Sequence, residues 1–329
     1  MAGVNDGMSD ADLHYALRRS EEINLRNWEI HFTLMYVADA LYFEFEGFCK
    51  QHGLEEKEST VMLKGLDTMA TRTDTAMWEL AKLADESGIG DLILEEDSAG
   101  LLESLKGDPR ATKWLDSLDK FLDVYGHRIT AAHLDVIFPT WIEDPTPVLD
   151  TVKTYIPKVR QGWDVRADRE KMTKEAQETS DNFKSKLSPD EQGGFQKLLE
   201  VGRRVYQFQE DHGFYIDGAS TARLHDVAMV CGRRLTNCRL LERAEDVFFL
   251  NYNELEEVMT GLKRPRLAAV SHYGRMVPNL VKERKWGWDQ VKELQEAPLT
   301  LGAVPEKVED PIMIKVFGMI DNVIKAGKV

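Results

Sequence analysis

Two stretches of this chain carry side chains that could move a proton. In residues 194–250, His212 and Arg223 recur with apolar residues at steps of three and four, and Asp217 and His225 flank that helical face. Imidazole titrates near neutral pH, and a carboxylate can accept a proton from a hydroxyl group. We therefore predict that His212, Asp217 or His225 acts as a general base.

The second stretch is a predicted loop in which His127, Arg128, His133 and Asp135 lie within nine residues. The prolines that follow rule out a continuous helix there, and loops rich in ionisable groups often carry function. Guanidinium groups can hold a transferring phosphoryl group, because they stabilise charge spread over its oxygens. We predict that His127, Arg128, Asp135 and Arg223 contact the substrate. A surface turn with capping side chains is the alternative.

The first helix, predicted over residues 12–51, is rich in aromatic side chains that form a wide apolar face. Core packing explains most of them, but it explains His31 less easily. An apolar pocket with a few polar groups suits an alcohol or a phenol, so we add His31 and Tyr215 to the predicted substrate contacts. Taken singly, each candidate is more often structural, such as a buried histidine bonded to a carbonyl oxygen.

Several common kinds of chemistry leave no motif in the sequence. We find no glycine-rich phosphate loop, no nucleophilic serine turn and no metal-ligand spacing among the histidines, carboxylates and three cysteines. No part of the chain alternates strands with helices. We therefore predict that this chain alone neither binds and activates a nucleotide nor holds a metal.

The predicted elements that position these residues are helices. Gly213 and Gly218 interrupt the long helix, at a cost of about 1 kcal/mol each relative to alanine, which predicts a kink or a backbone that another group approaches closely. Strand signals are scarce, and residues 247–250 carry the best one. The predicted fold is all-α, an elongated or two-lobed domain of many helices with at most a minor strand at 247–250.

Charge and composition limit the partners and the compartment. The net charge of −15 argues against nucleic acid or an anionic membrane as the main partner. We find no apolar signal core and no apolar run long enough to span a bilayer. The odd number of cysteines favours a reducing compartment, so we predict a cytoplasmic protein.

Five segments, in order, resemble regions of the phosphoenolpyruvate-synthase-type phosphotransferases, a group that includes rifampin phosphotransferase and phenylphosphate synthase. The most specific is FLDVYGHRITAAHLDVIFPTWIEDPTPVL at residues 121–149, with its YGHR and EDP motifs. MLKGLDTMATRTDTAMWELAKLA at residues 62–84 precedes it, and FQEDHGFYID and EDVFFLNYNEL follow it. LGAVPEKVEDPIMIKVFG is similar to the linker before the family's mobile domain, so the resemblance covers about residues 15–320.

The resemblance implies that this chain is one part of a larger enzyme. In the family, an ATP-grasp unit binds ATP and Mg²⁺, a swivelling domain carries a phosphohistidine, and a third unit binds the acceptor. None of the eight histidines lies in a Gly-Gly-x-x-Ser/Thr-His context, so we expect the phosphohistidine on another chain. The implied partners are an ATP-grasp subunit, a phosphohistidine subunit and a small aromatic hydroxyl compound.

The sequence departs from the family pattern in the loop and on the long helix. Residues 129–135 replace a glycine-rich loop and are one residue longer; Asp135 matches the family aspartate, and Ala132 or His133 takes the place of a glutamate. Of two positions that are basic in rifampin-type members, Thr221 is neutral and only His225 is ionisable. These differences argue against rifampin as the acceptor.

The main hypothesis is an acceptor-binding subunit of an ATP-dependent phosphotransferase, inactive alone, that passes a phosphoryl group from a partner's phosphohistidine to a phenol-like hydroxyl. We expect a disordered N-terminus (residues 1–10), a helical acceptor-binding domain (11–296) and a linker with a C-terminal helix (297–329). Two alternatives stay open: a non-catalytic scaffold that docks the two catalytic subunits, and an unrelated all-α ligand-binding protein.

Overall fold

The computed structural model describes residues 4–129, 135–262 and 266–294, and these residues are almost entirely helical. The α-helices are α1 (Asp10–Gln51), α2 (Glu56–Val61), α3 (Met69–Glu86), α4 (Gly90–Glu95), α5 (Ser98–Lys106), α6 (Thr112–Tyr125), α7 (Thr146–Arg160), α8 (Val165–Lys186), α9 (Pro189–His212), α10 (Ala219–Asn237), α11 (Tyr252–Gly261) and α12 (Arg266–Lys292). Short 3-10 helices cover Pro109–Ala111 and Ala244–Phe249, and a π-helix, η2, covers Gly213–Gly218. The predicted all-α fold is confirmed.

The prediction of a minor strand at residues 247–250 is wrong. That segment lies in the 3-10 helix Ala244–Phe249, and Leu250 follows it in an extended conformation. Within the described residues the only bridge of β type is an isolated antiparallel pair, Ile129 with Thr140. Apolar and aromatic residues raise strand propensity, but a strand needs a partner. Here Val247 is buried in an apolar cluster instead.

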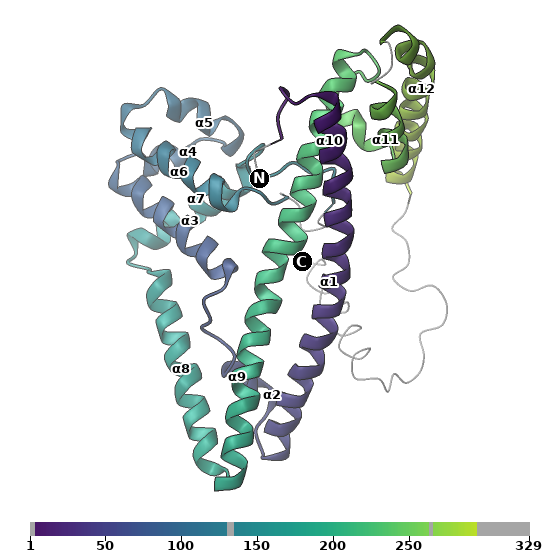
Figure 1. Cartoon of the computed structure of the whole chain (residues 1–329). Helices are drawn as coiled ribbons and strands as arrows, with labels where there is room; N and C mark the ends of the chain where they lie inside the picture. The colour runs from purple at the N-terminus through teal and green to yellow at the C-terminus, as the bar shows by residue number, and fades with distance from the viewer. Residues whose placement is uncertain (1–3, 130–134, 263–265, 295–329) are drawn as a thin grey trace. The chain divides into compact units, whose positions relative to one another are not determined.

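Two long helical rods lie side by side (Figure 1). One is α1, whose first turn is capped by the Ser9 side chain. The other is α9, η2 and α10, which follow one another without a break. Near the start of α1, Leu13 and Leu17 belong to one apolar cluster; near its end, Phe45 and Cys49 belong to another. The middle of α1 contributes to neither cluster and carries His31 together with exposed aromatic side chains such as Phe32 and Tyr36.

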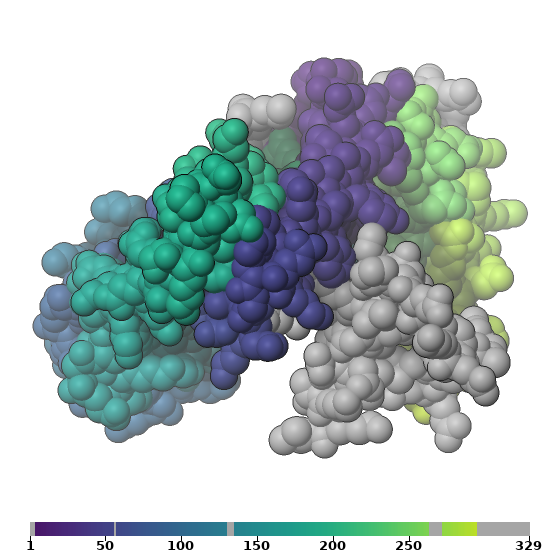
Figure 2. Space-filling view, turned by 90° about the horizontal axis from the view of Figure 1, so that it is seen from below, coloured from purple at the N-terminus to yellow at the C-terminus, as the bar shows by residue number. Residues whose placement is uncertain are grey.

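The second cluster joins the end of α1 to α2, α8 and α9. Phe45, Met62, Phe183 and Phe195 are buried there, and the rings of Phe183 and Phe195 meet edge to face with centroids 5.1 Å apart. Viewed from below, the ends of α1 and α2 pack beside α8 and α9 (Figure 2). This cluster fixes how α1 lies along α9.

A third apolar cluster belongs to α3–α7. Trp114 is its largest fully buried side chain, and its indole N–H donates to the Leu80 carbonyl at 2.9 Å. Phe121, at the end of α6, stacks on Trp141 with ring centroids 6.4 Å apart. This contact ties the loop between α6 and α7 to the cluster.

The chain divides by contacts into two compact units, Met1–Val281 and Lys282–Val329. The predicted domain division at residue 297 stays a prediction, and the predicted linker and C-terminal helix (297–329) lie outside the described residues. Among the helices that are described, none combines the length and the apolar character that a membrane crossing requires.

We expect Gly232→Ala to destabilise the protein by about 1–3 kcal/mol, because a Cβ there would lie 2.1 Å from the Ala244 carbonyl oxygen, which is backbone and cannot move aside. Urea unfolding measures the loss. Gly47→Ala is the matched control: it lies inside α1 with nothing within 4 Å of its Cβ, so it is expected to stabilise by roughly 0.5–1 kcal/mol. Equal effects of the two substitutions would contradict the close approach of α10 to residue 244.

Candidate functional site

The π-helix η2 (Gly213–Gly218) lies at the junction of α9 and α10, where the sequence has its two glycines. Hydrogen bonds of a π-helix join residues five apart, so residues i and i+5 lie on one face. His212 and Asp217 have this spacing. An α-helix would turn them away from each other, but here both point toward α1.

Two histidines and one aspartate meet where η2 faces the middle of α1. His31 Nδ1 lies 2.8 Å from Asp217 Oδ1 and 3.1 Å from His212 Nε2. His212 Nε2 lies 3.6 Å from Asp217 Oδ2. We call His31, His212 and Asp217 the triad. Its three groups come from two helices, because His31 is 181 residues before His212 in the chain.

The triad is enclosed, and its protons can be assigned from its contacts. The side chains of His212 and Asp217 are 8% and 7% exposed, and that of His31 is 17% exposed. His212 Nδ1 contacts the Gln209 carbonyl oxygen; only an N–H can donate there, so Nε2 of the neutral ring carries the lone pair. That lone pair faces His31 and Asp217 and can accept a proton.

Aromatic side chains of α1 surround His31. The Trp28 ring lies 4.9 Å from the His31 ring, and the Phe32 ring meets it edge on at 5.1 Å. Phe32 is 58% exposed, although it is a large apolar side chain next to a buried polar group. An exposed aromatic ring therefore borders the triad.

Residues 126–129 and 135–145, the described parts of the loop between α6 and α7, include Arg128, which lies beside η2. A Cβ at Gly218 would lie 3.5 Å from the Arg128 Cβ, which is ordinary van der Waals contact, and a Cβ at Gly213 would meet nothing within 4 Å. The predicted close approach of another group to these two glycines therefore stays a prediction.

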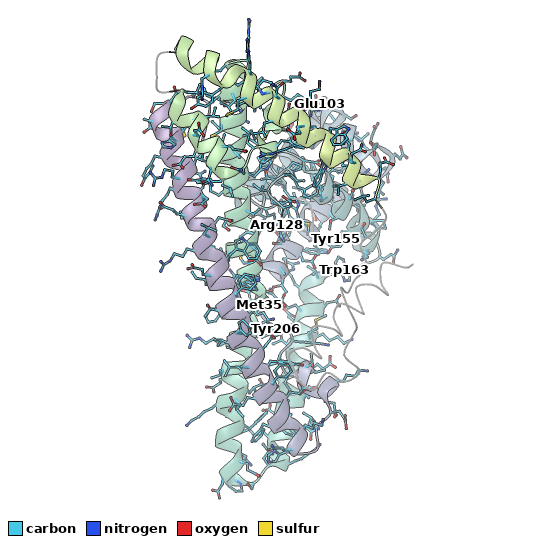
Figure 3. All side chains as sticks on the ribbon, turned by 90° about the vertical axis from the view of Figure 1, so that its right-hand side faces the viewer. Met35, Glu103, Arg128, Tyr155, Trp163 and Tyr206 are labelled. Atoms are coloured by element: carbon cyan, nitrogen blue, oxygen red, sulfur yellow. The ribbon has the colours of Figure 1, made fainter. Side chains whose placement is uncertain are left out.

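Arg128 is the cation that this loop brings to the site. Its guanidinium lies over the Trp141 ring at 4.5 Å and faces the Phe214 ring of η2 at 5.7 Å. Within the residues that the structure describes, no carboxylate forms an ion pair with it. Burial lowers the pKa of Arg128, because a charged group is less stable away from water. Figure 3 shows Arg128 beside the long helices, farther toward their upper ends than Met35 and Tyr206.

His225 on α10 contacts the same loop. Its Nδ1 contacts the Val136 carbonyl oxygen at 2.6 Å, and its Nε2 lies 2.8 Å from Glu143 Oε2 in an ion pair rather than an aligned hydrogen bond. Burial opposes a charge on His225, but Glu143 and the Val136 carbonyl outweigh it, so the pKa of His225 is raised. The contact with His225, opposed by burial and helped by Thr140, lowers the pKa of Glu143 to about 2.

The predicted site residues therefore divide into two groups. His212, Asp217 and His31 meet in the triad, whereas His225 lies with Glu143 and does not join them. No role was predicted for Glu143 from the sequence, although it belongs to the EDP motif. A carboxylate in a loop does not by itself reveal a histidine partner on a distant helix.

The other predicted contacts lie around these two groups. His127 is exposed and its Nδ1 lies 3.9 Å from Asp226 Oδ2, and burial raises the pKa of Asp226. Tyr215 is 56% exposed, and its hydroxyl donates to the Met69 sulfur at 3.2 Å.

Two further predicted substrate contacts, Asp135 and Arg223, do not take part in the triad. Asp135 accepts from the Ile137 N–H and so caps its own turn. Arg223 is half-buried on α10 and joins none of the triad's contacts within the described residues; His133 lies outside them.

Known proteins resemble much of this chain. The model of the family described as the rifampicin phosphotransferase fourth domain matches residues 31–210, more than half of the chain. The match includes His31 and Arg128 and ends just before His212. Chondramide synthase cmdD of Chondromyces crocatus is 25% identical over 258 residues, which are 76% of this chain and 6% of that protein.

A second relative carries a phosphotransferase name. The uncharacterized phosphotransferase YvkC of Bacillus subtilis (strain 168) is 22% identical over 253 residues, which are 74% of this chain and 29% of that protein. This chain therefore spans less than a third of the length of either relative.

We expect Glu143→Gln to reduce the free energy of unfolding by roughly 1–2 kcal/mol at pH 6, a value that allows for solvent screening because the Glu143 side chain is 34% exposed. The contribution of Glu143 is present above its usual pKa of 4.5 and is lost as pH falls toward 2. That of His225 is full below 6.5 and is lost as pH rises through its raised pKa.

The difference between wild type and Glu143→Gln should therefore be largest between about pH 4.5 and 6.5 and should shrink at higher pH. Urea unfolding across pH 5–9 measures it. Glu103→Gln, a change at an exposed surface pair with Lys106, is the control and should change little. A difference that does not shrink between pH 6 and pH 9 would contradict the charged His225.

Proposed function

The chain belongs to the family of the rifampicin phosphotransferase fourth domain, and from this we propose that it holds a hydroxyl acceptor while a phosphohistidine on another protein unit delivers a phosphoryl group to it. The single observation that carries the proposal is the triad. It places an imidazole lone pair beside a buried carboxylate at the edge of an exposed aromatic ring.

In the proposed reaction, the acceptor hydroxyl attacks the phosphorus atom of the phosphohistidine. The new O–P bond forms as the N–P bond breaks, and the electron pair returns to the histidine of the other unit. The hydroxyl proton passes to His212 Nε2, and Asp217 stabilises the resulting charge. This role requires a lone pair on Nε2, which the contact between Nδ1 and the Gln209 carbonyl supports.

Arg128 is the proposed site for the transferring phosphoryl group. A guanidinium matches phosphoryl oxygens and stabilises their charge in the transition state. A partly buried arginine that has no carboxylate partner within the described residues leaves its charge for an anion. Its contact with Gly218 ties the loop that carries it to the helix turn that carries the triad.

The proposed acceptor is a phenol or another apolar hydroxyl compound. The exposed Phe32 ring offers a surface for an aromatic ring, and its edge lies against His31. Aromatic pairs in offset or edge-on contact gain about 0.5–1.5 kcal/mol beyond the burial of their area. A small phenol stacked there would direct its hydroxyl toward the triad.

ATP and Mg²⁺ belong, in this proposal, to an ATP-grasp unit, and the phosphohistidine belongs to a swivelling unit. The small share of each relative that this chain matches supports a division of labour among several units.

A scaffold function is the second candidate. His127, His212 and His225 have three different partners and do not converge on one point. A chain that only docks the two catalytic units would not need them to converge.

The decisive experiment mixes the chain with purified ATP-grasp and phosphohistidine proteins from the same host, labelled ATP and a panel of phenols and alcohols. Phosphohistidine is acid-labile, whereas a phosphoester is acid-stable. We expect acid-stable label only when this chain and a hydroxyl compound are both present. Labelled phosphohistidine without any phosphoester would overturn the proposal. A phosphoester whose yield is unchanged in His212→Gln would favour the scaffold.

Arg128→Lys is expected to lower kcat/KM for the acceptor by roughly tenfold to a hundredfold, because lysine keeps the charge but loses the planar fork that holds two oxygens. Arg19→Lys is the matched control: Arg19 is exposed on α1 and pairs with Glu22, so its replacement should leave kcat/KM unchanged. An equal loss of kcat/KM in both variants would show that Arg128 does not hold the phosphoryl group.

Phe32→Ala is expected to raise KM for a phenol by about tenfold with little change in kcat, because the ring contributes to binding the substrate and its transition state alike. Tyr15→Ala removes another exposed aromatic side chain of α1 and serves as the control. An unchanged KM in Phe32→Ala would place the acceptor elsewhere.

A further inference from the structure

We propose that the triad binds one divalent transition-metal ion, such as Zn²⁺. The inference concerns the same three side chains as the proposed function but does not rest on the proposed reaction. The sequence contains no metal-ligand spacing, because His31 and His212 meet only when α1 packs against the junction of α9 and α10.

The spacing of the three ligand atoms fits one ion. Zinc binds imidazole nitrogen and carboxylate oxygen at about 2.0–2.1 Å, so neighbouring ligand atoms around a tetrahedral ion lie about 3.3 Å apart. In the triad, His31 Nδ1 lies 2.8 Å from Asp217 Oδ1 and 3.1 Å from His212 Nε2, and His212 Nε2 lies 3.6 Å from the other carboxylate oxygen, Asp217 Oδ2. All three ligand atoms lie within 4.8 Å of one another, and each side chain offers one of them. An ion between them requires only small shifts.

The surroundings of His212 are those of a metal ligand. A histidine that binds a metal through one ring nitrogen usually donates the other N–H to a carbonyl or carboxylate, which fixes the ring and its tautomer. His212 Nδ1 contacts the Gln209 carbonyl, one turn back on α9. Its Nε2 is thereby left for the triad. His31 would bind through Nδ1, and its ring proton would move to Nε2.

Charge also favours a cation. Asp217 is 6% exposed, and within the described residues its ion-pair partners are the two histidines, not an arginine or a lysine. With both rings neutral, the triad is a buried group of net charge −1, which is costly without compensation. A proton on one ring or a divalent ion would supply that compensation. Two imidazoles and one carboxylate suit zinc, iron(II) and cobalt rather than magnesium or calcium.

Three protein ligands would leave a position open for a small molecule, as in catalytic zinc sites. The oxygen of a hydroxyl compound bound there would have a lowered pKa, and its proton would leave to solvent while the charge stays on the metal-bound oxygen. The ion would then replace His212 as the group that makes the hydroxyl reactive.

The test is metal uptake by the full chain after treatment with a chelator. We expect one equivalent of Co²⁺ to bind and to give visible d–d absorption, and one equivalent of Zn²⁺ to displace it and raise the Tm. X-ray absorption of the zinc-loaded wild-type protein should show two imidazole ligands and no sulfur. This readout needs no variant and no partner protein.

Asp217→Asn and His31→Gln are each expected to weaken Co²⁺ binding by at least roughly tenfold to a hundredfold, with circular dichroism to check that the helices remain. His52→Gln is the matched control, because it removes a histidine–carboxylate pair outside the triad, His52 with Glu191, and leaves the triad intact. Less than one equivalent in wild type, sulfur ligands, or equal binding in the triad variants would overturn the site. Failure of phosphoryl transfer would leave this result untouched.

Discussion

The site depends on one change of helical hydrogen bonding, from α to π, at Gly213–Gly218. An uninterrupted α-helix from residue 189 to 237 would keep His212 and Asp217 on different faces. The π-turn brings both toward His31. The metal hypothesis and the base hypothesis both rest on this turn, because each needs His212 and Asp217 to face the same space.

The apolar clusters at the two ends of α1 explain why a polar group such as the triad can be buried between them. Leu13 and Leu17 anchor one end of α1, and Phe45 and Cys49 anchor the other, so the pairing of the two long helices does not depend on the residues between. Burial of apolar side chains at both ends supplies the stability that a buried histidine–carboxylate group would not supply by itself. The middle of α1 is thereby free to carry His31 and exposed aromatic rings.

The sequence predicted much of the fold and only part of the site. Helical periodicity predicted the all-α architecture and a long first helix over residues 12–51, close to α1 as observed, since periodicity is a local signal. The strand predicted at residues 247–250 was wrong, because strand propensity does not show whether a segment has a partner strand. His31, His212 and Asp217 were each named, but their meeting was not foreseen: a π-turn has no reliable sequence signal beyond glycines, and helix pairing is not local. Glu143 was missed for the same reason.

The attachment of the Arg128 loop has a consequence for its motion. The Trp141 N–H donates to the Arg128 carbonyl, the Thr140 N–H donates to Glu143, and Glu143 is held by His225. These links form a chain in which each depends on the next, so they open together rather than singly. The backbone amides of Thr140 and Trp141 should therefore exchange with solvent together, through opening of the contact between Glu143 and His225.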